Sequence, residues 1–242
     1  ITEYPSDLTL SKIQNKSYLK TFTNTKKYIN FLGIALAMND FHKHGIMHLN
    51  LNPDHIYLDS NFYPKIFSFD FSKLSKSEID QNDSIYVAPE LFSDNNAGPE
   101  NDVYSFGMIA YTFFTGKIPK IECAKNVSPI AKQICDGKRP DTSLIKDRKL
   151  VQFLEKCWAG NPSQRYNFET IVDQLLKGKY QKAFDGFDKK EVDNYIKLFN
   201  VKSGIDEVNQ NEEFRVFLFK HTEENYACKI SSKQTVFDVI AK

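Results

Sequence analysis

Apolar residues recur every three or four positions from Thr25 to His44, the spacing of a helix with a buried face. Thr25 is the expected N-cap, and Gly45 fits the left-handed position that ends many helices. A second apolar run extends from Val103 to Phe114. Because it is shorter than the ~20 residues that a membrane helix needs, it predicts a buried core helix.

Similar signals predict further helices downstream. The residues that mark them are Ser128-Pro129 with Gly137 for the first, Leu150, Phe153, Leu154 and Cys157 for the second, Asn167 through Leu176 for the third, and Val192, Tyr195, Ile196 and Phe199 for the fourth. In the first segment the cap, the Pro and the Gly each stand in a favoured place for a helix end, and in the third Asn167 is the expected cap. The chain is therefore expected to be mainly α in an α+β fold.

Short apolar runs predict a small hairpin in the first half of the chain. Ile56-Tyr57-Leu58 and Lys65-Ile66-Phe67 flank the turn-forming residues Asp59-Ser60-Asn61.

The last part of the chain predicts two strands and a helix. Phe214 to Phe219 and Tyr226 to Ile230 are the expected strands. Thr235 to Asp238 has capping-box spacing, which predicts a helix through Ile240. This order resembles the start of a ubiquitin-like β-grasp domain.

Composition narrows the function classes. The chain has 242 residues, 41% hydrophobic and 26% charged, with a formal net charge of +1. No basic field supports a nucleic acid or an acidic membrane as partner. The four cysteines show no Cys-x-x-Cys spacing, so reduced thiols and a cytoplasmic location are expected.

The stretch from His48 to Asp59 reads His-Leu-Asn-Leu-Asn-Pro-Asp-His-Ile-Tyr-Leu-Asp. It resembles the catalytic loop of protein kinases, in which His-Arg-Asp-Leu-Lys-Pro-x-Asn precedes a short apolar strand. The matching residues are His48, Leu51 and Pro53; the replaced ones are Leu49 for Arg, Asn50 for the catalytic Asp, Asn52 for Lys and His55 for the metal-binding Asn. Residues that shape the loop are kept, whereas residues that do chemistry are replaced.

A second catalytic motif is also altered. Ser68-Phe69-Asp70 occupies the place of the kinase Asp-Phe-Gly motif, with Ser68 where the metal-binding Asp belongs. An alignment shifted by two would make Asp70-Phe71-Ser72 that motif, but the gapless count from His48 favours Ser68. In an extended backbone Ser68 and Asp70 point the same way, so Asp70 is a substitute carboxylate on this alignment.

Further motifs follow at kinase spacing. Ala88-Pro89-Glu90 matches the end of the activation segment, and Asn101 to Gly107 resembles the start of the large C-lobe helix. Cys157-Trp158 and Arg165 resemble the end of tyrosine-kinase-like domains. The ordered series identifies the C-terminal lobe of a protein kinase fold.

The resemblance implies a division of the chain. Residues 1–178 would be the hinge and C-lobe, 179–209 a helical linker, and 210–242 a partial α+β segment of ubiquitin-like type. Glu3 and Tyr4 would be hinge residues beside the nucleotide. The chain begins at Ile1 rather than Met, so we expect an N-terminus that is cut and a nucleotide cleft that needs a small lobe not present here.

The resemblance also implies structural roles for the retained residues. Glu90 and Arg165 would form a buried ion pair that ties the activation segment to the helical subdomain. Asp102 would accept hydrogen bonds from the catalytic-loop backbone. His48 would pack that loop, a structural rather than a catalytic role.

The replacements predict impaired phosphoryl transfer. Asn50 is too weak a base to accept a proton, and Asn52 lacks the positive charge of the usual Lys. Ser68 and His55 are poor Mg²⁺ ligands compared with carboxylates. No cofactor is expected, and any ATP or Mg²⁺ binding should be weak. The sequence thus indicates a pseudokinase that binds other signalling proteins.

Two other interpretations remain open. The first is an unconventional active kinase, in which Asp70 or Asp59 supplies the missing carboxylate. The second is a passive interaction module that works through its C-terminal segment. Mutation of Asp70 tests the unconventional kinase, and a pull-down that compares residues 179–242 with the lobe alone tests the passive interaction module.

Overall fold

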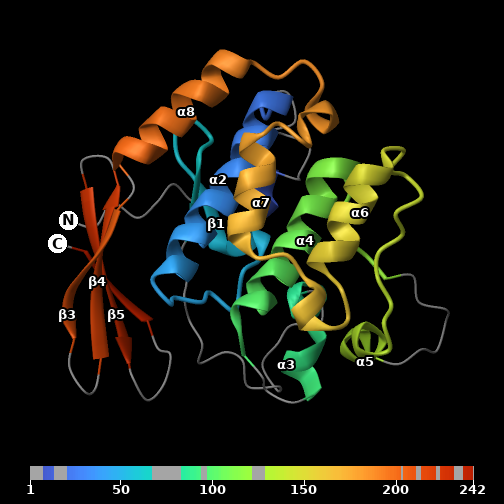
Figure 1. Cartoon of the computed structure of the whole chain (residues 1–242), viewed down its shortest axis with the longest axis horizontal. Helices are drawn as coiled ribbons and strands as arrows, with labels where there is room; N and C mark the ends of the chain where they lie inside the picture. The colour runs from blue at the N-terminus through green and yellow to red at the C-terminus, as the bar shows by residue number, and fades with distance from the viewer. Residues whose placement is uncertain are drawn as a thin grey trace.

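The computed structural model describes residues 8–13, 21–66, 83–93, 97–121, 129–202, 204–210, 214–221, 224–231 and 237–241. These residues form a mainly helical body with a two-stranded sheet, joined to a separate four-stranded sheet (Figure 1). Phe67 and the segment from Ser68 to Asp70 lie outside the described residues, as do Glu3 and Tyr4.

Two long helices form the centre of the body. Helix α2 (Asn24–Lys43) and helix α4 (Pro99–Thr115) are both buried along most of their length. Phe31 of α2 stacks on Phe106 of α4 with ring centroids 5.3 Å apart. The core-helix prediction for Val103 to Phe114 is confirmed, because α4 is buried on nearly every side.

The ends of α2 differ slightly from the prediction. Thr23 caps the helix, since its hydroxyl accepts a hydrogen bond from the Lys26 amide at 3.3 Å. Thr25 is therefore not the N-cap; its hydroxyl instead accepts from the Asp188 amide at 2.9 Å. At the other end Gly45 has a φ of +70°, the left-handed conformation expected there.

The remaining helices of the body are short or peripheral. The α-helices are α1 (Leu10–Ile13), α3 (Pro89–Ser93), α5 (Ile130–Cys135), α6 (Arg148–Cys157), α7 (Phe168–Leu176) and α8 (Lys189–Lys202). Single 3₁₀ turns are η1 (Pro53–His55), η3 (Asp83–Tyr86), η4 (Pro162–Gln164) and η5 (Gln181–Phe184). Asn167 caps α7 by accepting from the Thr170 amide at 2.8 Å, as predicted.

The predicted hairpin is present. Strand β1 (Ile56–Leu58) pairs antiparallel with β2 (Pro64–Ile66), and Ile56 lies opposite Ile66. Asp59 shapes the turn, because one of its carboxylate oxygens accepts from the amides of Asn61 and Tyr63, both at 2.8 Å.

The C-terminal region corrects the prediction. Strands β3 (Gly204–Gln210), β4 (Phe214–His221), β5 (Glu224–Ser231) and β6 (Phe237–Ala241) form one antiparallel sheet in that order. The predicted strands correspond to β4 and β5, and the helix expected after Thr235 is wrong.

Pairing explains the difference. Phe237 to Ile240 offers aromatic and β-branched residues beside the free edge of β5, and ladder hydrogen bonds outweigh a short capping signal. The helical linker likewise ends at Lys202, and β3 follows where a helix through residue 209 was expected. The result is a meander rather than the strand-strand-helix order of a β-grasp.

Candidate functional site

The loop from His48 to His55 is fixed by one buried carboxylate. Asp102, in the first turn of α4, is fully buried and accepts from the backbone amides of His48 at 2.8 Å and Leu49 at 2.6 Å. The imidazole Nε2 of His42 lies 2.8 Å from the same carboxylate. The positive end of the α4 dipole favours a negative charge at this position. The C-terminus of α2 and the N-terminus of α4 thus hold the loop between them.

Leu49 adopts a strained backbone conformation at this point. Its φ is +56°, in the left-handed region that non-glycine residues rarely occupy, and its side chain is buried. The short hydrogen bond from its amide to Asp102 stabilises this geometry. A buried apolar side chain thus stands where the kinase pattern has a charged Arg.

His48 is also buried and bonded within the loop. Its Nδ1 lies 3.3 Å from the Asn50 amide, which can only donate, so Nδ1 is the acceptor. Its ring stacks on that of His55 with centroids 6.1 Å apart. His48 is thus enclosed by the loop that contains it.

The replaced positions bond to one another. Asn52 is buried, and its side-chain oxygen accepts from the amides of Asp54 at 2.9 Å and His55 at 3.2 Å, so it caps η1. Its amide nitrogen donates to the side-chain oxygen of Asn50 at 3.4 Å. His55 Nδ1 donates to the backbone carbonyl of Asn50 at 2.8 Å. Asn50, Asn52 and His55 therefore form a closed network that maintains the loop.

This network offers little chemistry for phosphoryl transfer. Neutral amides neither abstract a proton nor balance phosphate charge, and an imidazole is a poor Mg²⁺ ligand. Within the described part of the chain, no group of three or more His, Cys, Asp or Glu side chains is arranged to hold a metal ion. Ser68 and Asp70, the other metal-position candidates, are outside the described residues.

Glu90, in α3, and Arg165 form a bidentate ion pair. Arg165 Nη1 and Nη2 lie 2.6 and 2.8 Å from the two carboxylate oxygens of Glu90. The guanidinium also donates to the carbonyls of Ala159 at 2.9 Å and Glu100 at 3.0 Å. The Arg165 side chain is fully buried, and that of Glu90 is 11% exposed. The pair connects the end of the activation segment to the turn before α7.

Several residues around this pair were not anticipated from the sequence. The Asn101 side chain donates to Glu90, and Ser105 Oγ donates to the Tyr86 carbonyl at 2.7 Å. The guanidinium groups of Arg139 and Arg165 each lie 5.2 Å from the ring centre of Tyr104, and burial raises the pKa of the Tyr104 hydroxyl. Only the position of Asn101 beside Asp102 at a helix start could have indicated this cluster.

Among the described helices, none is both long and apolar enough to cross a lipid bilayer. The longest, α2, carries charged and polar residues along its 20 positions. Its burial comes from packing against the helices and the hairpin of the same body.

Comparison with known sequences places this geometry in a family. A sequence profile of the protein kinase domain matches residues 1–177. The ankyrin repeat and protein kinase domain-containing protein 1 of Mus musculus is 33% identical over 164 residues, which are 59% of this chain and 22% of that protein. The receptor-interacting serine/threonine-protein kinase 1 of Homo sapiens is 30% identical, over 60% of this chain and 25% of its own.

A relative of lower identity also matches this chain over only a small part of its own length. A putative serine/threonine-protein kinase/receptor of Acanthamoeba polyphaga mimivirus is 26% identical over 73% of this chain and 11% of its own. The chain thus spans a quarter or less of the length of these relatives. With a matching profile over most of its length and a mainly helical kinase-like fold, the chain belongs to the protein kinase family.

Proposed function

We propose that this chain is the large lobe of a pseudokinase, which binds other signalling proteins rather than transferring phosphate. One observation carries the proposal. Asn50 stands where the family has its catalytic Asp, and the carbonyl and side-chain oxygens of Asn50 are both engaged inside the loop. The side-chain amide of Asn50 is far too weak a base to accept a proton from a substrate hydroxyl, and its oxygen is already bonded within the loop.

The chemistry of the site supports this proposal. Loss of a general base costs ~10²–10⁴-fold in rate, and Asn52 leaves transferring phosphate charge without its usual partner. Meanwhile Glu90, Arg165 and Asp102 keep their bonds, so the lobe retains its shape. A lobe that keeps these structural bonds but lacks the catalytic groups fits a binding role.

An unconventional active kinase is the second candidate, because relatives of this chain are named serine/threonine-protein kinases. It requires a carboxylate from elsewhere, such as Asp59 or Asp70. Asp59 accepts two turn amides and lies in the hairpin turn, on the far side of β1 from the loop. Asp70 is therefore the residue to mutate for this candidate.

A phosphate-transfer assay separates the two candidates. We expect no transfer from radiolabelled ATP to a generic protein substrate, either by this chain or by a form extended upstream to include a small lobe. Asn50→Ala should leave that background unchanged. Asn194→Ala, on the exposed side of α8, controls for handling of the variant. Transfer that Asn50→Ala or Asp70→Ala abolishes would refute the pseudokinase proposal.

Nucleotide binding is a separate prediction. In a thermal-shift measurement, a ligand at 100 times its Kd adds about 2.7 kcal/mol, which corresponds to roughly 5–10 °C for a domain of this size. Because the Mg²⁺ positions are replaced, we expect no Mg²⁺-dependent shift with ATP. A shift that requires Mg²⁺ would support the active kinase, and one that does not would identify nucleotide as a structural ligand.

A further inference from the structure

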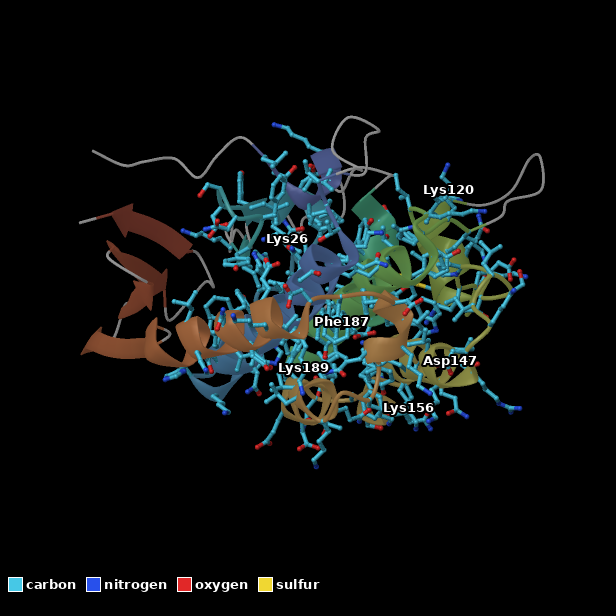
Figure 2. All side chains as sticks on the ribbon, turned by 90° about the horizontal axis from the view of Figure 1, so that it is seen from above. Lys26, Lys120, Asp147, Lys156, Phe187 and Lys189 are labelled. Atoms are coloured by element: carbon cyan, nitrogen blue, oxygen red, sulfur yellow. The ribbon has the colours of Figure 1, made fainter. Side chains whose placement is uncertain are left out.

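Helix α8 lies against the kinase lobe although it follows the segment that the family profile matches. The profile ends at residue 177, and α8 begins at Lys189. In Figure 1 α8 crosses beside α2 and the β1–β2 hairpin and leads to the four-stranded sheet. Figure 2 shows the same arrangement from above, with Lys26 and Phe187 close to the helix. The contact involves a face of the lobe well away from α6.

Gly33 marks the centre of this contact. A Cβ atom placed on Gly33 would lie 2.2 Å from the hydroxyl of Tyr195 and 2.7 Å from Cγ of Pro64. A glycine inside a helix costs about 1 kcal/mol relative to alanine, so its presence here needs a packing reason. The absence of a side chain lets α2, β2 and α8 meet at one point.

Aromatic and charged contacts surround this point. Tyr195 is buried and packs edge-on against Tyr63 with ring centroids 4.9 Å apart. Lys26 forms an ion pair with Glu191 and lies 4.8 Å from the Tyr63 ring centre. Burial, reinforced by the nearby Asp59, raises the pKa of Tyr195, as expected for a hydroxyl enclosed by neighbouring elements. One side of α8 thus makes aromatic and charged contacts with α2 and the hairpin.

The segment before α8 is bound to the start of α2. Asn24 donates to the Asp185 carbonyl at 2.8 Å, and Thr25 accepts from the Asp188 amide. The Tyr28 ring packs on those of Phe184 and Phe187, with centroids 5.3 and 5.1 Å apart. These contacts hold the connection as well as the helix.

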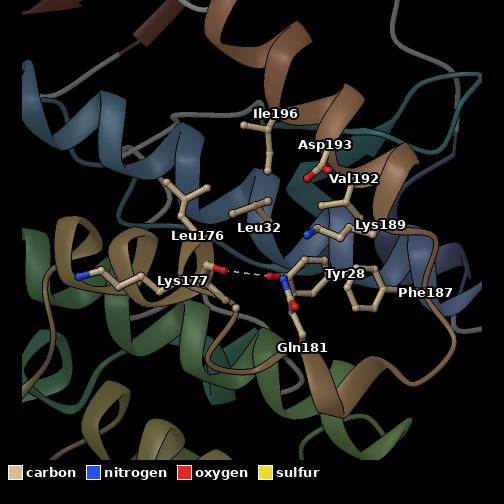
Figure 3. A pocket seen from close by; sticks show the side chains of 12 residues that line it. Tyr28, Leu32, Leu176, Lys177, Gln181, Phe187, Lys189, Val192, Asp193 and Ile196 are labelled. Atoms are coloured by element: carbon tan, nitrogen blue, oxygen red, sulfur yellow. Dashed lines mark hydrogen bonds between the residues drawn. The ribbon is translucent and has the colours of Figure 1, made fainter.

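The other side of α8 is packed less closely against the lobe. It forms one wall of a pocket of about 320 Å³ between α2 and the end of α7, where the Tyr28 hydroxyl donates to the Leu175 carbonyl (Figure 3). Residues that line it include Tyr28, Leu32, Leu176, Phe187, Val192 and Ile196. Helix α8 is therefore in close contact with the lobe on the side of Gly33 and Tyr63, whereas its other side faces the pocket.

We propose that the docking of α8 against Gly33, Tyr63 and Pro64 braces the catalytic loop against local opening. The link is direct along the chain, because His55 is followed at once by β1, and the turn from β1 to β2 carries Tyr63. A hairpin held by α8 therefore holds the end of the loop. This proposal does not depend on whether the lobe transfers phosphate.

Hydrogen exchange on the full chain tests the brace. Tyr195→Ala should raise exchange at least ~10-fold in α8, in the hairpin over 56–66 and at the loop amides over 48–55, because local opening follows loss of local packing. Gly33→Ala, which displaces Tyr195, should act the same way. Exchange in α6 should not change, since α6 packs on α4 instead.

Two variants serve as controls. Tyr195→Phe keeps the ring and should resemble the unmodified chain. Leu198→Ala changes an α8 residue that is 43% exposed and should also have no effect. Faster exchange confined to α8 would show that docking does not reach the loop, and an equal rise in α6 would show general destabilisation. Either result overturns the proposal, as does unchanged exchange in Tyr195→Ala.

Discussion

Replacing Arg165 by methionine should lower the free energy of unfolding by about 3–5 kcal/mol, the range for removing one partner of a buried ion pair. The Arg165 side chain is fully buried, and its guanidinium makes two bonds to Glu90 and two to backbone carbonyls. Methionine has a similar length but leaves the Glu90 carboxylate unpaired. Urea denaturation followed by circular dichroism measures the loss.

Two comparisons make this result specific. Arg148→Met changes an exposed arginine at the start of α6 and should alter stability by no more than about 0.5 kcal/mol. Arg165→Lys keeps the charge but not the planar fork, so an intermediate loss is expected. A loss below about 1 kcal/mol for Arg165→Met would mean that the pair behaves like a surface pair.

The lobe was largely predictable because its helices carry strong local signals. The α2 and α4 segments have dense apolar residues and glycine ends, and the hairpin has a turn that Asp59 stabilises. The cap of α2 was misplaced by two residues because Thr23 and Thr25 are equally good caps by composition. Only the three-dimensional structure shows that Thr25 instead accepts a hydrogen bond from Asp188, the residue before α8.

The last strand was not predictable for a related reason. Capping-box spacing at Thr235 is a signal within one segment, whereas the pairing of β6 with β5 depends on the register of two strands, in which Ile230 lies opposite Phe237. The docking of α8 at Gly33 was missed in the same way. Its apolar residues predicted a helix with a buried face, but not which surface would bury it.

In the catalytic loop, the motifs identify the replaced residues but not the hydrogen bonds that these residues make. The sequence showed that Asn50, Asn52 and His55 replace catalytic residues. It did not show that these residues bond to one another, because their contacts depend on the turn at η1. The role suggested for Asp102 came from family resemblance, and the positions of the His48 and Leu49 amides give it a physical basis.

Asp102→Ala should produce a second large loss, about 3–5 kcal/mol in the free energy of unfolding. The substitution leaves the buried amides of His48 and Leu49 without their acceptor, and each unsatisfied buried group costs about 1–3 kcal/mol. It also removes the bond that holds Leu49 in its left-handed conformation, so the loop backbone should rearrange at this residue. Chemical denaturation measures the total, and hydrogen exchange at residues 48–52 locates it.

Asp173→Ala is the matched control, because Asp173 is an exposed carboxylate on α7 that forms an ion pair with Lys177 one turn away. Surface pairs of this kind contribute about 0.3–0.5 kcal/mol, so its loss should be small. Asp102→Asn provides the sharper comparison, since the amide keeps one acceptor oxygen but turns a donor toward amides that also donate. If Asp102→Asn and Asp102→Ala both proved as mild as Asp173→Ala, the loop would be held by the packing of His48 and Leu49 rather than by the carboxylate.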